Sequence, residues 1–166
     1  MRRVLLTGMS GTGKSTVIAE LAARGYRAID TDDGGLSELV SVPEDEPTGL
    51  APGQDWVWRA ERIHALLTAD DADTLFLGGC SPNQGAFYPQ LDHIILLTAP
   101  ADVIVERLAT RTTNPYGKRP EEVARVLGLV RTIEPILRRG ADHVVDASAP
   151  LDQVVATVLR LVGEPA

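Results

Sequence analysis

A phosphate-binding loop is the clearest chemical signal in the sequence. Residues 8–15 read GMSGTGKS and match the pattern GxxxxGK[ST] at every required position. Glycines let backbone N–H groups turn inward around an anion, and the N-terminus of a following helix adds positive potential. Lys14 can reach the phosphates of a nucleoside triphosphate, and the Ser15 hydroxyl can ligate Mg²⁺. The residues expected to hold the nucleotide are Gly8, Ser10, Gly11, Thr12, Gly13, Lys14, Ser15 and Thr16.

Two aspartates, Asp30 and Asp32, directly follow the second expected strand. In an open parallel sheet, ligands bind beyond the carboxyl ends of the strands, so both carboxylates are expected to point toward the phosphate loop. One of them can hold Mg²⁺ through water, and the other can orient an acceptor hydroxyl and take its proton. An acidic pair after a strand also serves as a turn or helix cap. The neighbouring phosphate loop favours the functional interpretation.

Three arginines later in the chain can neutralise phosphate charge. Arg107 and Arg111 are four residues apart on one expected helix and share a face. Arg111 is expected to border the nucleotide base, whereas Arg107 equally fits a salt-bridged surface position. Arg119 lies at the end of residues 112–119, a polar segment with Gly and Pro that is expected to be a flexible lid. An arginine there can swing over the transferring phosphoryl group, although a solvated surface position is the alternative.

The second substrate is expected to meet residues from two other segments. The tryptophans Trp56 and Trp58 and the arginine Arg59 fall on an expected helix over residues 55–69. Two residues apart on a helix, the tryptophans do not share a face, so one can be core and the other can line a pocket. Arg59 is the candidate to meet an anionic acceptor. Gly78-Gly79 closes the third expected strand and can let an acceptor approach the backbone, or simply form a tight turn.

The elements that must position these side chains alternate along the chain. Short apolar runs predict strands at 3–7, 26–29, 74–77, 93–97 and 143–145. Helical spacing predicts helices at 15–24, 55–69, 100–111, 120–139 and 150–162, the fourth of them bent or split near Gly128 and Pro135. Strands that are apolar throughout, alternating with helices, predict an α/β fold with a parallel sheet covered on both faces.

Composition limits the class of protein. The chain has 166 residues, which indicates one domain over 1–166, with the acceptor-side segment at about 31–62. A net charge of −7 disfavours binding to nucleic acid through a broad basic face. One cysteine, Cys80, allows no internal disulfide, and no apolar run approaches the ~20 residues that span a bilayer. We therefore expect a cytoplasmic protein, monomeric or homodimeric, that interacts with neither membranes nor nucleic acid.

Taken together, these motifs resemble the shikimate and gluconate kinase branch of the nucleoside-monophosphate-kinase-like P-loop family. The resemblance runs through GMSGTGKST, DTD, Trp58-Arg59, the GG after the third strand, Lys118-Arg119-Pro120 and VVDASAP. It implies a three-layer α/β/α sandwich around a five-stranded parallel sheet, with ATP and Mg²⁺ as cofactors. Asp30 would assist Mg²⁺, Asp32 would bind the acceptor hydroxyl, and Arg119 would contact the phosphates.

The resemblance also implies where the adenine and the acceptor bind. The adenine-contacting loop would be Ala147–Pro150, with Arg111 on the other side of the base. Two positions depart from the shikimate kinase pattern. Cys80 stands where a third glycine is typical, and Ile133 stands where an arginine binds the acceptor carboxylate.

A second resemblance, to the small nuclear adenylate kinase family, rests on three stretches of the chain. They are GGC with Phe87-Tyr88-Pro89, the strand 93–97, and ERLATR at 106–111. We therefore expect an ATP-dependent kinase acting on a small-molecule acceptor, with Lys14, Asp32 and Arg119 as its catalytic residues. The alternatives are a nucleoside monophosphate kinase, or an ATPase that acts as a regulatory nucleotide-binding protein.

Overall fold

Five parallel strands form the central sheet of the computed structural model, which describes residues 1–48 and 50–166. The strands are β1 (Arg2–Thr7), β2 (Arg27–Asp30), β5 (Thr74–Gly78), β6 (His93–Thr98) and β7 (His143–Asp146), in the order β2-β5-β1-β6-β7. Each pairs in parallel with its neighbours. The expected five-stranded parallel sheet is therefore confirmed, and each expected strand lies within two residues of its position.

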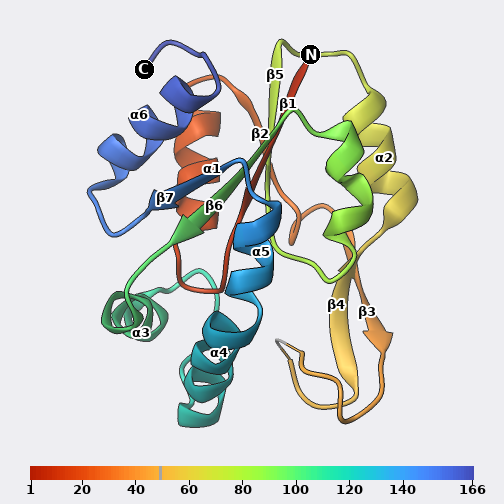
Figure 1. The fold of residues 1–166 in the computed structure, drawn as a ribbon, viewed down its shortest axis with the longest axis vertical. Coiled ribbons are helices and arrows are strands. Elements are labelled where there is room, and N and C mark those ends of the chain that lie inside the picture. The colour runs from red at the N-terminus through yellow and green to blue at the C-terminus, as the bar shows by residue number, and fades with distance from the viewer. Residues whose placement is uncertain (49) are drawn as a thin grey trace.

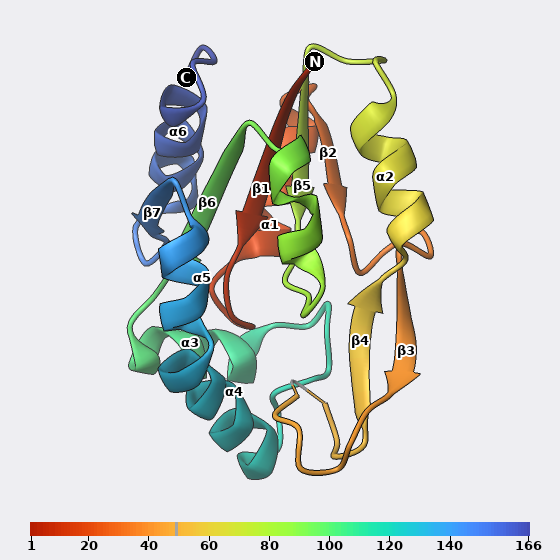
Figure 2. The same cartoon turned by 45° about the vertical axis from the view of Figure 1, so that its right-hand side comes forward.

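Helices cover both faces of this sheet (Figures 1 and 2). They are α1 (Lys14–Ala23), α2 (Ala60–Thr68), α3 (Ala101–Thr110), α4 (Pro120–Thr132), α5 (Glu134–Gly140), α6 (Leu151–Leu161) and the 3₁₀ helix η1 (Gln84–Gln90). Along β1, Val4 and Leu6 pack with α1 and α6, whereas Leu5 packs with α2 and η1 on the opposite face. The alternation of strand side chains thus builds two cores, which completes the expected three-layer sandwich.

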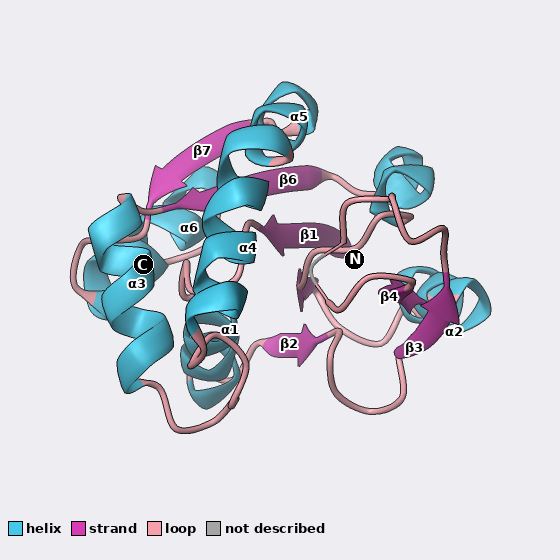
Figure 3. Cartoon of the chain, turned by 90° about the horizontal axis from the view of Figure 1, so that it is seen from below, coloured by secondary structure: helices cyan, strands magenta, loops and turns pink. Residues whose placement is uncertain are grey.

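A separate antiparallel hairpin replaces the start of the expected helix 55–69. It pairs β3 (Ser37–Ser41) with β4 (Gln54–Trp58), and α2 begins only at Ala60. The helix prediction for residues 55–59 was therefore wrong. Aromatic and β-branched residues such as Trp56, Val57 and Trp58 favour a strand, and the partner strand that stabilises it is the preceding arm of the hairpin. The hairpin lies to one side of the main sheet, away from α3 and α6 (Figure 3).

Two other elements differ from the prediction. The expected helix 120–139 is two helices that meet at Ile133, between the two positions where a break was expected. The 3₁₀ helix over Gln84–Gln90 was not predicted at all. Every helix in the described part of the chain is too short or too polar to cross a membrane.

Core packing gives a first prediction, on stability. Phe76 on β5 is fully buried, and its ring meets Tyr26 edge-on with centroids 5.5 Å apart. Phe76→Ala should lower the free energy of unfolding by about 3–5 kcal/mol, because it removes apolar contact and leaves a cavity. Leu39→Ala, at a side chain that is 51% exposed, should change it by less than ~0.5 kcal/mol. Urea denaturation measures both variants, and equal effects would contradict this account of the core.

Candidate active site

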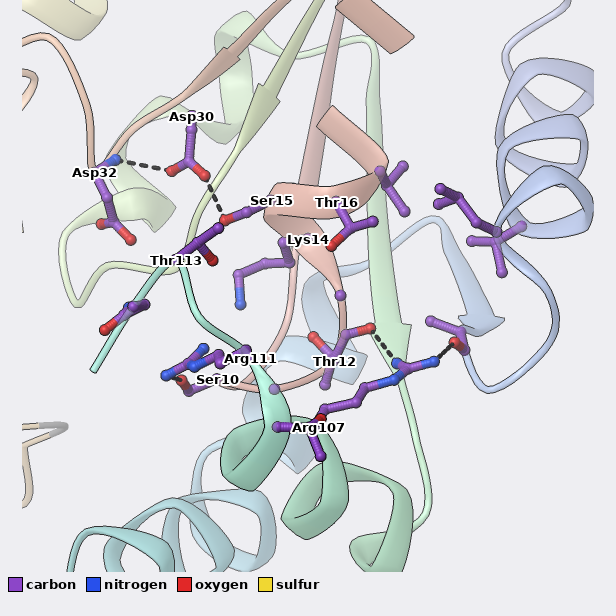
Figure 4. A pocket seen from close by; sticks show the side chains of 18 of the residues that line it. Ser10, Thr12, Lys14, Ser15, Thr16, Asp30, Asp32, Arg107, Arg111 and Thr113 are labelled. Carbon is purple, nitrogen blue, oxygen red and sulfur yellow. Dashed lines mark hydrogen bonds between the residues drawn. The ribbon is translucent and has the colours of Figure 1, made fainter. Parts of the chain in front are cut away.

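The phosphate loop joins β1 to α1 at the carboxyl edge of the sheet (Figure 4). Gly11 and Gly13 have φ angles of 84° and 98°, a region that side chains with a Cβ rarely adopt. Gly13 is the N-cap of α1 and makes no side-chain cap hydrogen bond. The first N–H groups of this helix therefore face the loop and are available to an anion.

Lys14 lies in the middle of the site. Its Nζ donates to the carbonyl oxygens of Gly8 and Met9, at 2.7 and 3.0 Å. Burial of the ammonium beneath the loop lowers the pKa of Lys14, while the charges of Asp32 and Asp30 act in the opposite direction. Phosphate oxygens arriving at the loop would be stronger acceptors than these carbonyls, and they would favour the charged lysine.

The two predicted aspartates stand beside Lys14, as Figure 4 shows. Ser15 Oγ donates to Asp30 Oδ2 at 2.5 Å, and Asp30 Oδ1 accepts the backbone N–H of Asp32 at 3.0 Å. Asp32 Oδ1 accepts the indole N–H of Trp56 from the hairpin, also at 3.0 Å. Partial desolvation, followed by the nearby charge of Asp30, raises the pKa of the Asp32 carboxyl. One hydrogen-bonded chain therefore connects the phosphate loop to the hairpin.

Two arginines from α3 and its end form the opposite wall of the site. Arg107 donates to the carbonyl oxygens of Thr12 at 3.0 Å and Ala147 at 2.5 Å. Arg111 donates to Tyr116 O at 2.5 Å and lies 3.4 Å from Ser10 Oγ. The sequence analysis did not decide whether Arg107 lies at the surface or in the site. In the structure Arg107 lines the cavity. It fastens the phosphate loop to the loop after β7.

These groups line a cavity of about 310 Å³. Most of the predicted nucleotide-binding residues are in its wall. The cavity is lined by Ser10, Gly11, Thr12, Gly13, Lys14, Ser15, Thr16, Asp30, Asp32, Arg111 and Ala147 from the prediction, and by Val17, Arg107, Thr110, Thr113, Asn114, Ala149, Leu151 and Val154 besides. Gly8 and Pro150 are predicted residues that do not line the cavity, although Gly8 accepts the Lys14 hydrogen bond.

The predicted lid residue Arg119 is exposed and lies outside the cavity. It precedes α4, where its backbone N–H donates to Glu122. The lid segment instead brings Thr113 and Asn114 to the cavity wall. Lys118 donates to the carbonyl oxygens of Ala109 and Arg111 at the end of α3. In this arrangement the segment contacts the end of α3, and Arg119 does not take part in the cavity wall.

The remaining predicted acceptor residues also lie outside the cavity. A Cβ on Gly78 would strike Ile18, and a Cβ on Gly79 would strike Thr31 Oγ1, so close packing already requires both glycines. Arg59 follows β4, where its guanidinium approaches Glu38 on β3 at 3.6 Å. The structure thus gives each of the three residues a structural contact, and their contact with a substrate stays a prediction.

A buried polar network after β5 escaped the sequence analysis. Asn83 accepts the backbone N–H of Trp58 and donates to its carbonyl oxygen, as a paired strand would. Gln84 binds Thr7 on β1 and the backbone N–H of Ser81. The network holds the end of the hairpin at a fixed position relative to the phosphate loop. Its only sequence signal was a run of side chains, Ser81-Pro82-Asn83-Gln84, able to bond backbone.

The donor set fits Mg²⁺ bound together with a nucleotide. Among the residues described, no group of three or more His, Cys, Asp or Glu is arranged to hold a metal alone. Ser15 and Asp30 supply two oxygen donors at the mouth of the phosphate loop. Mg²⁺ characteristically takes a few protein oxygens and completes its shell with phosphates and water. This arrangement matches that mode of binding.

The contacts of Arg107 give a prediction on nucleotide affinity. Arg107→Ala should weaken binding of a nucleoside triphosphate by roughly ten-fold, because two charge-assisted hydrogen bonds that fix the two loops are lost. Arg160→Ala, at an exposed arginine on α6, is the matched control and should bind normally. Calorimetric titration measures both, and unchanged affinity in the Arg107 variant would show that the two loops hold their positions without it.

Comparisons with known proteins identify the family of the chain. A family model described as an AAA domain matches residues 4–128. Shikimate kinase 2 of Yersinia enterocolitica is 30% identical over 97% of this chain and 95% of its own length. A shikimate kinase of Syntrophus aciditrophicus is 29% identical over 96% of this chain and 90% of its own.

Solved structures share the fold at lower identity. A shikimate kinase from Acinetobacter baumannii in complex with shikimate has a TM-score of 0.64 and 16% identity, covering 98% of this chain and 93% of that one. A deoxyadenosine kinase from M. mycoides with bound dATP has a TM-score of 0.58 and 13% identity, covering 98% and 100%. With its complete phosphate loop and this sheet order, the chain belongs to the shikimate-kinase-like family of P-loop kinases and is an ATP-dependent kinase.

Proposed function

We propose that this kinase transfers the γ-phosphoryl group of Mg-ATP to a hydroxyl group of a small molecule. The observation that carries the proposal is the chain of contacts from Ser15 through Asp30 to Asp32 beside Lys14. The metal donors Ser15 and Asp30, the phosphate-binding Lys14 and the carboxylate of Asp32 all line the same cavity. A protein that only binds a nucleotide needs the first two of these and has no use for the third.

Each group of residues in the site has its own role in binding the nucleotide and its metal. The loop amides and Lys14 bind the phosphates, Arg107 fastens the phosphate loop to the loop after β7, and Ser15 and Asp30 would hold Mg²⁺. When bound, Mg²⁺ neutralises charge on the β- and γ-phosphates. Ala147 and its neighbours in the loop after β7, including the predicted Pro150, border the adenine opposite Arg111. Closure of residues 112–119 carries Arg119 over the phosphoryl group and excludes water.

Asp32 is the base of the proposed reaction. Its carboxylate orients the acceptor hydroxyl and takes the proton as the oxygen bonds to the γ-phosphorus. The bond from that phosphorus to the β,γ-bridging oxygen breaks, and ADP leaves. The acceptor lies between the hairpin in residues 31–62 and the phosphate loop, within reach of Arg59, Gly78 and Gly79. We further propose that residues 1–166 act as one catalytic domain.

The test is ADP release from Mg-ATP, with and without a panel of hydroxyl compounds and nucleoside monophosphates. Stimulation of ten-fold or more by a hydroxyl compound supports the proposal. Stimulation by a nucleoside monophosphate alone would favour the adenylate-type alternative, for which the ERLATR sequence of α3 is the supporting observation. Slow release that no acceptor changes would indicate a regulatory nucleotide-binding protein.

The raised pKa of Asp32 predicts a pH dependence. A base must be ionised, so kcat/KM should fall as the pH drops through a pKa above the ordinary value of about 4. The indole N–H of Trp56 stabilises the carboxylate, so Trp56→Phe should raise this pKa and move the fall to higher pH. Asp32→Asn should lose most of the activity at every pH. An unchanged profile in the Trp56 variant would contradict the role of this contact.

The proposed closure of residues 112–119 predicts that Arg119 affects the rate of phosphoryl transfer. Arg119→Ala should lower kcat by roughly 10³-fold or more where the arginine stabilises the transferring phosphoryl group. Nucleotide affinity should change little, because Arg119 lies outside the cavity before closure. Arg131→Ala, at an exposed arginine of α4, is the matched control. A kcat for the Arg119 variant within a few-fold of the unaltered enzyme would remove this residue from the mechanism.

A further inference from the structure

In the described part of the acceptor-side segment, residues 31–48 and 50–62, each basic side chain binds a partner from the same segment. The segment contains eight acidic residues and two basic ones, Arg59 and Arg62. Both arginines bind partners within the segment: Arg59 approaches Glu38 at 3.6 Å, and Arg62 donates to Gly35 O at 2.9 Å. Across the antiparallel pair, Glu38 lies opposite Val57, so Glu38 and Arg59 extend on the same side of the hairpin.

The helices across from the hairpin do not supply the missing charge. Arg125 on α4 lines a groove of about 360 Å³ together with Glu44 and Glu46 from the loop between β3 and β4, so the charged residues that line this groove are more acidic than basic. At the junction of α4 and α5, Ile133 packs into an apolar cluster that includes Met9, Leu96 and Leu137. A carboxylate arriving here would meet an aliphatic side chain.

The cations of the phosphate cavity are committed to the nucleotide in the proposed function. Lys14, Arg107 and Arg111 all line the cavity, and each binds the phosphate loop directly. On the acceptor side, the carboxylates of Asp30 and Asp32 lie close together, because Asp30 Oδ1 accepts the backbone N–H of Asp32 at 3.0 Å. A second anion beside them would be repelled and would lose its hydration without gaining a partner.

We propose that the phosphoryl acceptor is a hydroxyl compound without a carboxylate or phosphate group, either uncharged or bearing an amine, and that Glu38 determines this selectivity by neutralising Arg59. The proposal rests on the function proposed above and narrows its substrate class. Glu38 acts through Arg59 and is therefore a specificity-determining residue, distinct from the residues that take part in phosphoryl transfer.

Matched acceptors that differ in charge test the substrate class. In each pair the first compound is anionic and the second carries no negative charge: shikimate and its methyl ester, gluconate and sorbitol, AMP and adenosine. Glucosamine is added as an acceptor that bears an amine. With Mg-ATP, the member without negative charge should have the higher kcat/KM by ten-fold or more in any pair that turns over. An anionic member that equals or exceeds its partner overturns the inference.

Binding gives a readout that does not need turnover. Both tryptophans of the chain, Trp56 and Trp58, lie on β4, so their fluorescence reports ligands at the hairpin. In the Mg-ADP complex, members without negative charge should bind at least ten-fold more tightly than their anionic partners. Equal affinity within every pair, including no binding by any member, overturns the inference.

A charge-removing variant tests Glu38 itself. Glu38→Gln frees Arg59 and should improve kcat/KM or affinity for the anionic members by roughly five-fold relative to their partners, the effect of one screened charge at this distance. Asp45→Asn removes a charge from the same segment at an exposed residue for which no ion pair is found in the described chain, and should leave the ratio unchanged. Equal shifts in the two variants overturn the role of Glu38.

The inference and the proposed function fail separately. Efficient phosphorylation of an anionic hydroxyl compound leaves the kinase function standing and overturns the acceptor class. Selective binding of uncharged or amine-bearing members without any phosphoryl transfer supports the acceptor class and overturns the kinase function.

Discussion

The parallel pairing of β1 with β5, and of β5 with β2, determines where chemistry can occur in this chain. Parallel strands end at the same edge, and Asp30 on β2 pairs with Gly78 on β5, which lies beside Leu6 on β1. This register brings Asp30 next to the loop that begins two residues later, at Gly8. Without it, the hydrogen bond between Ser15 and Asp30 could not form, because the two residues belong to separate elements of the sheet.

That constraint explains the glycines at the strand ends as well as the polar residues. The strands approach so closely there that a Cβ on Gly8 would strike the carbonyl oxygen of Leu97, and one on Gly79 would strike Thr31. Close packing of the backbone leaves the loop amides as the surface that a phosphate can meet. The carboxyl edge of the sheet then has room for two ligands in the proposed function: a nucleotide beside α3 and an acceptor beside the hairpin.

Charge divides the edge into two halves. Lys14, Arg107 and Arg111 face the phosphate cavity, whereas the acceptor-side segment carries most of the net negative charge of the chain. A nucleotide with its metal fits the first half through charge neutralisation. The second half provides Asp32 and two arginines that already bind partners there, Arg59 with Glu38 and Arg62 with the carbonyl oxygen of Gly35. The same division that favours phosphoryl transfer therefore also restricts the charge of the acceptor.

The sequence predicted those parts of the molecule that depend on local pattern. Apolar runs located the strands, and the glycine spacing located the phosphate loop, because both are short and need no distant partner. The hairpin was missed because β4 exists only through its pairing with β3, so that Trp56 and Trp58 gave a helical interpretation. Arg107 was left undecided because its two acceptors, on Thr12 and Ala147, are brought together only by the sheet.

Contacts that span the chain account for the other gaps. Asn83 binds the backbone of Trp58, a partner that no spacing rule connects to it. Arg59 carried a predicted acceptor contact, and the sequence could not show that Glu38 would face it across the hairpin. For Arg119, the structure shows one position of the lid, and its predicted contact with phosphate depends on closure.

The most direct test of the central claim follows the γ-phosphoryl group itself. Mg-ATP labelled at the γ-phosphorus is incubated with the enzyme and an uncharged or amine-bearing hydroxyl acceptor, and the products are separated. Phosphoryl transfer to the acceptor predicts that the label appears as a phosphate ester of the acceptor, in an amount equal to the ADP formed. Label found only in inorganic phosphate, at the same rate with and without acceptor, would contradict it.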